Sequence, residues 1–175
     1  MRPLPQLRHQ LLPVEVLRLT HPPILETRHL RWADEADCAA FAAVLAQLPA
    51  LREAYVELCG GLGAGKTTFV RHLLRALGVS GRIKSPTFAV LEPYRIGTLE
   101  ISHFDFYRFT DAREWDDAGF REIFSMPGLK LAEWPENAHG ALPLPDLRLR
   151  INITGDAQRD VSLQAFTPRG VTLVK

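Results

Sequence analysis

The stretch GGLGAGKT at residues 60–67 constrains the fold of this chain more than any other part of the sequence. It matches the pattern G-x-x-x-x-G-K-[ST] at every fixed position. An apolar, strand-like stretch at 54–60 leads into it, and a helical pattern at 66–77 follows and stops at Gly78. A strand, a glycine loop and a helix in this order predict a site for the phosphates of a nucleoside triphosphate, because an accidental glycine-rich turn rarely has this context.

Each residue type in the loop has a physical role in phosphate binding. Glycines allow the backbone turns that point successive N–H groups inward at the phosphates. The helix that begins at the loop adds its free N–H groups and the positive end of its dipole. Lys66 supplies a charge for the β- and γ-phosphates, the Thr67 hydroxyl is suited to bind Mg²⁺, and Thr68 is expected to reach the α-phosphate.

The hydrophobic pattern of the whole chain predicts an α/β fold. Expected strands lie at 27–33, 54–60, 88–96, 98–109, 128–134, 145–154 and 159–168, and expected helices at 34–48, 66–77 and 111–124, the last with Asp111 as its N-cap. The turns near Gly97 and at 155–158 predict antiparallel hairpins. We therefore expect a P-loop NTPase-like mixed sheet flanked by helices, with antiparallel hairpins at its edges.

Length and composition predict one folded domain with an N-terminal extension. The chain has 175 residues, of which 46% are apolar, and this is enough for one sizeable core. Residues 1–26 hold five of the 13 prolines and predict an irregular or partly disordered extension, although 13–20 are also compatible with a short edge strand. We expect the nucleotide-binding domain to occupy 27–175.

Charge and cysteine content exclude several classes of protein. The net charge of +1 argues against a nucleic-acid or membrane surface. No apolar run approaches the ~20 residues that span a bilayer, and the N-terminus lacks a signal-peptide pattern. Cys38 and Cys59 have no metal-ligand spacing, and we expect no disulfide between them. These features predict a cytoplasmic protein.

Two carboxylates are candidates for the metal and for catalysis. Asp105 and Glu133 each close an apolar, strand-like stretch, so each is placed to lie at the carboxyl edge of the sheet beside the phosphate loop. Either one alone could be a solvated strand end, but a bound metal needs a carboxylate partner. Thr87, in the sequence SPT, lies about 20 residues after Lys66, where small P-loop switch proteins place a threonine that touches Mg²⁺; a plain turn is an equally good interpretation.

The residues around these carboxylates leave more than one interpretation open. Arg108 is equally compatible with a phosphate-sensing arginine and with a surface charge. Trp134 fits the core better than a functional role, and His103 fits a structural position in a strand.

The absence of two sequence motifs bears on which nucleotide is bound and which reaction is catalysed. No N-K-x-D motif is present, so ATP is favoured over GTP. The loop ENAHGALPLP after Pro135 contains no arginine, which weakens a small-molecule kinase without excluding it.

Four motifs together indicate a family. GGLGAGKTT, KSPTF, HFDFYR and LAEWPE occur in this order, and the chain from about 27 to 168 resembles the TsaE (YjeE) family, the bacterial ATPase subunit needed to form threonylcarbamoyladenosine in tRNA. The chain departs from the family at Gly61, where an aspartate is usual, and in its proline-rich N-terminal extension.

The resemblance implies roles for individual residues. Thr67 and Glu133 would bind Mg²⁺, Asp105 would be needed for hydrolysis, and Thr87 would act as the switch threonine. The start of the first helix, around Cys38, and part of the final hairpin would lie near the adenine. The triphosphate would be held by Gly60, Gly61, Leu62, Gly63, Ala64, Gly65, Lys66, Thr67 and Thr68.

The resemblance also implies a reaction and partners. The chain would hydrolyse ATP with Mg²⁺, weakly when alone, and would reset a complex with a TsaD-like transferase and a TsaB-like protein, meeting tRNA only through that complex. A P-loop small-molecule kinase and a nucleotide-gated binding module without catalytic turnover are the alternatives.

Overall fold

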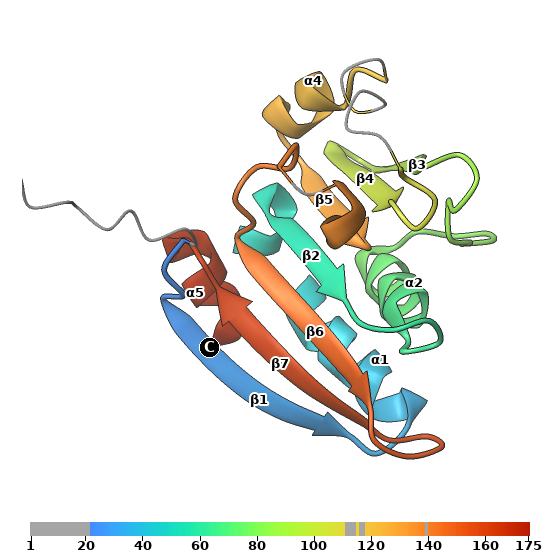
Figure 1. Ribbon diagram of the computed structural model, residues 1–175, viewed down its shortest axis with the longest axis vertical. Coiled ribbons are helices and arrows are strands. Elements are labelled where there is room, and N and C mark those ends of the chain that lie inside the picture. Colours follow the sequence, from blue (N-terminus) through green and yellow to red (C-terminus); the bar gives the residue numbers. More distant parts are fainter. Residues whose placement is uncertain (1–21, 111–114, 116–117, 139) are drawn as a thin grey trace, which may run out of the picture.

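The computed structural model describes residues 22–110, 115, 118–138 and 140–175 (Figure 1). Within these residues, a seven-stranded sheet has the order β1-β7-β6-β2-β5-β4-β3. The strands are β1 (Glu26–Trp32), β2 (Tyr55–Cys59), β3 (Leu91–Ile96), β4 (Leu99–Asp105), β5 (Leu129–Glu133), β6 (Leu147–Ile153) and β7 (Arg159–Ala165). The predicted α/β fold class is confirmed.

The middle of the sheet is parallel and its margins are antiparallel. β2 pairs in parallel with β5 and with β6, and β4 pairs in parallel with β5. β3 and β4 form an antiparallel hairpin at one edge. The hairpin of β6 and β7 is also present, but β1 pairs antiparallel with β7 and takes the other edge. The carboxyl ends of β2, β4 and β5 therefore meet on one side of the molecule.

Helices α1 (Glu35–Ala46), α2 (Lys66–Leu77) and α5 (Pro168–Val174) cover one face of this sheet. In Figure 1, α1 lies behind β6, and α2 lies to the right of β2. Because side chains alternate along a strand, every second residue of each central strand faces these helices. The fully buried side chains of this core include Leu45, Leu58, Phe69, Leu73, Ile101, Leu131 and Leu149. In the described part of the chain, no helix is long and apolar enough to cross a membrane.

The two helices next to the glycine loop begin and end for local reasons. The Asp34 carboxylate caps α1, because it accepts hydrogen bonds from the N–H groups of Ala36 at 2.8 Å and Asp37 at 3.2 Å. α2 begins directly after Gly65 and ends at Gly78, which adopts a left-handed φ of 105° as the sequence predicts. The glycine loop is therefore held between β2 and a helix with a fixed start.

The opposite face carries a separate aromatic cluster over β4, β5 and β2. The short helix α4 (Phe120–Ser125) packs there, and the rings of Phe104 and Phe120 meet edge to face with centroids 5.3 Å apart. The buried aromatic members of the cluster are Tyr55, Phe104, Phe106, Phe109, Trp115 and Phe120. Two short 3-10 helices, η1 (Pro49–Glu53) and η2 (Pro135–Ala138), are also present.

Several predicted element boundaries are wrong. The predicted helix at 111–124 is interrupted, because Gly119 has a left-handed φ of 69° and α4 begins only at Phe120. The predicted N-cap Asp111 lies outside the described residues, as do 1–21 of the predicted extension and the stretch 13–20. The strand predicted from 88 begins only at 91, after Val90 with its φ of 65°.

The helix α5 is a feature that the sequence analysis missed. The strand predicted at 159–168 ends at Ala165, and Thr167 then caps a helix by accepting a hydrogen bond from the Gly170 N–H at 3.1 Å. Pro168 suits the first position of this helix because its missing N–H is not needed there. The predicted strand at 98–109 is likewise shorter, ending at Asp105.

The close packing of α5 against the start of β6 gives a test of the fold. A Cβ at Gly170 would lie 1.8 Å from the backbone oxygen of Asp146, so we expect Gly170→Ala to lower the free energy of unfolding by at least about 2 kcal/mol. Urea unfolding followed by circular dichroism measures this. Gly155→Ala is the control, because its added Cβ would meet only ordinary contacts at 3.7 Å or more. Equal effects of the two changes would contradict the packing described.

Candidate functional site

The glycine loop has backbone angles that favour glycine at three of its positions. Gly60, Gly63 and Gly65 have φ values of 146°, 76° and 110°, which L side chains rarely adopt. A Cβ at Gly60 would also lie 2.4 Å from the backbone oxygen of Ile151 on the neighbouring strand. Gly61 is different, because its φ lies outside the left-handed region and an added Cβ would meet no atom within 4 Å. An aspartate therefore fits at Gly61 without backbone strain.

Lys66, the first residue of α2, folds back onto this loop. Its side-chain amine donates hydrogen bonds to the backbone oxygens of Gly60 at 2.6 Å and Gly61 at 2.9 Å. The same amine lies 3.8 Å from the centroid of the Trp134 ring, a cation–π contact. Burial lowers the pKa of the Lys66 amine, and the charge of Glu133 opposes that shift. Trp134 therefore belongs to the site, although the sequence favoured a core position for it.

Thr67 and Glu133 meet at the carboxyl end of β5. The Thr67 hydroxyl lies 3.0 Å and 2.8 Å from the two carboxylate oxygens of Glu133. Parallel pairing of β2 with β5 places Leu58 beside Glu133, so the carboxylate lies next to the start of the loop. Glu133 is 2% exposed, and His103 Nε2 contacts its Oε1 at 2.9 Å. His103 thus orients a carboxylate at the site, in addition to its place in the strand.

Asp105 holds the second predicted segment, SPT. It pairs with Glu133 in the register of β4 and β5, so the two carboxylates lie side by side at one edge of the sheet. The Thr87 hydroxyl donates to Asp105 Oδ2 at 2.7 Å, and the Ser85 hydroxyl donates to the same oxygen. The Tyr107 N–H donates to Oδ1 at 2.9 Å. Asp105 is therefore the anchor of the loop that carries Thr87.

The donor set at Thr67 and Glu133 fits Mg²⁺ bound together with phosphates. Within the described residues, no group of three or more histidine, cysteine, aspartate or glutamate side chains forms a metal cage. Mg²⁺ commonly takes one or two protein oxygens and fills its remaining positions with water and substrate phosphates. The Thr67 hydroxyl and the Glu133 carboxylate supply such oxygens beside the phosphate loop.

A cavity of about 130 Å³ adjoins the loop on its other side. It is lined by Trp32, Asp34, Glu35, Cys38, Gly63, Ala64, Gly65, Thr68, Ala157 and Arg159. The cavity therefore brings together the start of α1, the loop and the turn between β6 and β7. Cys38 and Thr68, both predicted to contact the nucleotide, are among the residues that line it.

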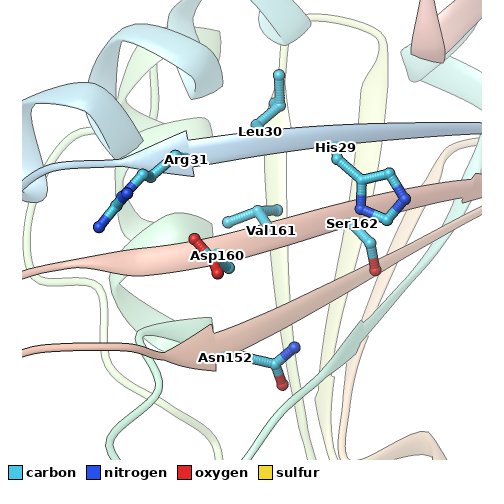
Figure 2. A pocket seen from close by; sticks show the side chains of 7 residues that line it. All are labelled: His29, Leu30, Arg31, Asn152, Asp160, Val161 and Ser162. Carbon is cyan, nitrogen blue, oxygen red and sulfur yellow. The ribbon is translucent and has the colours of Figure 1, made fainter.

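A larger hollow, of about 540 Å³, lies on the opposite face of the sheet (Figure 2). Polar side chains from β1, β7 and β6 line it, and none of them was predicted to bind nucleotide. Figure 2 shows His29 and Ser162 directed away from Leu30, which packs against the main core. This hollow is separate from the site at the loop.

The structure brings most of the predicted residues into one region, in two groups. Lys66, Thr67 and Glu133 form one group, and Thr87 and Asp105 form the neighbouring one. Leu62, at the outer side of the loop, is 75% exposed and makes no such contact. Arg108 stacks on the Phe88 ring, 4.2 Å from its centroid, so it is not bonded to the carboxylates there.

Sequence analysis missed three residues that act on the site or its loop: Ser85, His103 as a partner of Glu133, and Arg159. Ser85 belongs to the SPT sequence that was singled out for Thr87, and its hydroxyl could have been recognised as a second hydrogen-bond donor. No local signal marks Arg159, which lies 95 residues from its loop partner Ala64.

Comparison with known proteins decides the family. The family model described as "Threonylcarbamoyl adenosine biosynthesis protein TsaE" matches residues 32–161. The tRNA threonylcarbamoyladenosine biosynthesis protein TsaE of Haemophilus influenzae is 39% identical over 134 residues, which cover 77% of this chain and 84% of that protein. This chain belongs to the TsaE family. The resemblance stated from the four motifs is therefore confirmed.

Other members of the TsaE family agree in sequence and in structure. The Bacillus subtilis protein of the same description is 38% identical over 114 residues, covering 65% of this chain and 71% of that protein. The crystal structure of Bacillus subtilis YdiB superposes with a TM-score of 0.70 at 28% identity, covering 85% of this chain and 91% of that one. The fold described above is thus shared with this solved structure.

The two thiols give a test of burial at the site. Burial, and then the nearby Glu35 charge, raise the pKa of Cys38 to about 12, and burial and Glu57 raise the pKa of Cys59 to about 11. Since only the thiolate is nucleophilic, we expect both thiols of the folded protein to react slowly with an aromatic disulfide reagent at about pH 8, where an ordinary free thiol is partly ionised. In concentrated urea both should react rapidly. Fast reaction of either thiol in the native protein would show that it is accessible.

Proposed function

We propose that this TsaE-family chain binds ATP with Mg²⁺ and hydrolyses it, as a subunit of the machinery that forms threonylcarbamoyladenosine in tRNA. One observation carries the proposal: the Glu133 carboxylate contacts the Thr67 hydroxyl beside the glycine loop, with Asp105 on the adjacent strand end. A hydroxyl, a metal-binding carboxylate and a second carboxylate in this arrangement are the parts that ATP hydrolysis needs.

Binding uses groups that are already in place. The N–H groups of the loop and of the first turn of α2 take the phosphates, and the Lys66 amine exchanges the carbonyls of Gly60 and Gly61 for phosphate oxygens. Thr67 and Glu133 hold Mg²⁺, which when bound neutralises charge on the phosphates. The cavity beside Cys38 takes the adenine.

Hydrolysis depends on Asp105 and on the segment it anchors. Asp105 accepts hydrogen bonds from the hydroxyls of Ser85 and Thr87, so the SPT segment is latched to the strand end. Release of Thr87 from this latch lets the threonine turn to the phosphates and frees Asp105 to orient the attacking water. The latch is thus the element with two positions that nucleotide state biases.

The chain is a weak ATPase alone, and partners stimulate it. In the described residues, no arginine side chain is bonded to Asp105 or Glu133, and Arg108 stacks on Phe88. A TsaD-like transferase with a TsaB-like protein supplies the missing groups, and hydrolysis resets that complex between rounds of transfer. Such activating contributions can raise phosphoryl transfer about a thousandfold or more.

The direct test is release of phosphate from ATP by the chain alone and with a TsaD-like and a TsaB-like protein. We expect slow release alone and a clear increase with both partners. We expect Asp105→Asn to lower the stimulated rate by about a hundredfold while ATP affinity changes little, because Asp105 acts on the reacting water and not on the loop. Calorimetry measures the affinity independently.

The outcome separates this proposal from its alternatives. A binding module without turnover would show normal function in cells with Asp105→Asn. A small-molecule kinase would transfer the γ-phosphate to an added metabolite instead of releasing it. Failure of the partners both to bind and to stimulate would refute the assignment to the complex.

Metal dependence gives a second test. Glu133→Gln keeps the size of the side chain and its neighbours Thr67 and His103 but removes the charge, so we expect the gain in ATP affinity on adding Mg²⁺ to fall about tenfold or more. Titration of ATP with and without Mg²⁺ measures it. Glu136→Gln is the matched control, because Glu136 is an exposed carboxylate near Lys66 without a contact to Thr67. An unchanged Mg²⁺ effect in Glu133→Gln would remove this residue from the metal site.

A further inference from the structure

We propose that Arg159 is a positioning residue for the phosphate loop. It holds the peptide bond between Ala64 and Gly65 so that the N–H of this peptide faces the phosphates. The inference rests on the proposed binding of nucleotide and assigns a part of that site to the first residue of β7. Arg159 lies on the wall of the small cavity, opposite the start of α1.

The guanidinium of Arg159 bridges the loop and the turn between β6 and β7. Its Nε donates to the backbone oxygen of Ala64 at 2.8 Å, and its Nη2 lies 3.5 Å from the backbone oxygen of Gly63. On the turn side, Nη1 donates to the backbone oxygen of Gln158 at 2.9 Å. Longer contacts of Nη1 reach the backbone oxygens of Gly155 at 3.3 Å and Asp156 at 3.4 Å.

Because a peptide bond is planar, the contact to the Ala64 oxygen also sets the direction of the Gly65 N–H. In a trans peptide the C=O and the following N–H point in opposite directions. The Ala64 oxygen shares its peptide with the Gly65 nitrogen, so a donor that holds the oxygen outward turns the Gly65 N–H inward. The N–H of Ala64 itself is already used, because it donates to the Gly61 oxygen at 3.1 Å.

Gly65 needs this external support. It has a φ of 110° directly before α2 and lacks a side chain, so its own backbone preferences leave the peptide free to rotate. The carbonyls of Gly60 and Gly61 are held by Lys66 from inside the loop, and Arg159 holds the Ala64 carbonyl from the sheet. Lys66 leaves its two carbonyls when it turns to the phosphates in the proposed binding, whereas Arg159 keeps the Ala64 carbonyl.

Arginine suits this position because of its shape. Its planar fork carries five N–H donors in fixed directions, so one side chain serves carbonyls on both the loop and the turn. A lysine has a single flexible amine and cannot hold both sets at once. The turn is also tied to β1, since the Arg31 guanidinium donates to the Gln158 side-chain oxygen at 2.7 Å.

The experiment compares Arg159→Gln with the wild-type chain by calorimetric titration of ATP and of ADP. We expect Arg159→Gln to weaken both affinities by about tenfold, equally for ATP and ADP, because the misplaced N–H serves phosphates that both nucleotides share. We also expect KM for ATP to rise while kcat with the partners stays within about twofold. Arg159→Lys keeps the charge but not the fork and should bind nearly as weakly as Arg159→Gln.

One control variant and a measurement of folding accompany this titration. Arg28→Gln removes the same charge from β1, where Arg28 contacts the backbone oxygens of Val174 and Lys175 and neither the loop nor the turn, and it should bind nucleotide like the wild type. Thermal unfolding shows whether each variant is folded at the temperature of the titration. Unchanged affinity in a folded Arg159→Gln, or full affinity in Arg159→Lys, would overturn the role assigned to Arg159. If the wild-type chain itself binds no nucleotide, the proposed function fails first.

Discussion

Parallel pairing of β2, β5 and β4 is the constraint on which the site depends. It brings three carboxyl strand ends to one edge of the sheet, with Leu58 beside Glu133 and Asp105 beside Glu133 in register. A shift of either register by one residue would turn a carboxylate to the other face of the sheet. The buried apolar faces under α1 and α2 hold that register, so the geometry of the site depends on the packing of the core.

The site also contains two charged side chains that are buried. Lys66 and Glu133 are only 4% and 2% exposed, so each depends on the groups around it. Two backbone oxygens and an aromatic ring surround the amine, while a threonine hydroxyl and His103 contact the carboxylate. Among the described residues, His103 Nδ1 is buried without a hydrogen-bond partner, so Nε2 makes the one side-chain contact of this ring, to Glu133. The carboxylate and its contacts are thus arranged by the fold, whereas the amine must exchange its two carbonyl contacts in the proposed binding of phosphate.

The site joins the central strands to a segment that is held by few contacts. The glycine loop and Glu133 lie on the central strands, whereas the SPT segment is tied down through hydroxyl contacts to one carboxylate oxygen of Asp105. Hydroxyl contacts of this kind exchange at a smaller cost than core packing. In the proposed mechanism, the same strand end anchors the segment in one state and releases it in another.

The sequence by itself determined the local parts of this protein: the glycine loop, the helix from Lys66 to its stop at Gly78, the alternating strands and, through four ordered motifs, the family. Those features depend on residues that are neighbours in the chain. It missed the break at Gly119 within the predicted helix 111–124, and it missed α5, where the cap at Thr167 overrides the hydrophobic pattern. Only the tertiary structure decided that His103 meets Glu133, Ser85 meets Asp105 and Arg159 meets Ala64, because these pairs are 30, 20 and 95 residues apart and only the pairing of distant strands brings them within hydrogen-bond distance.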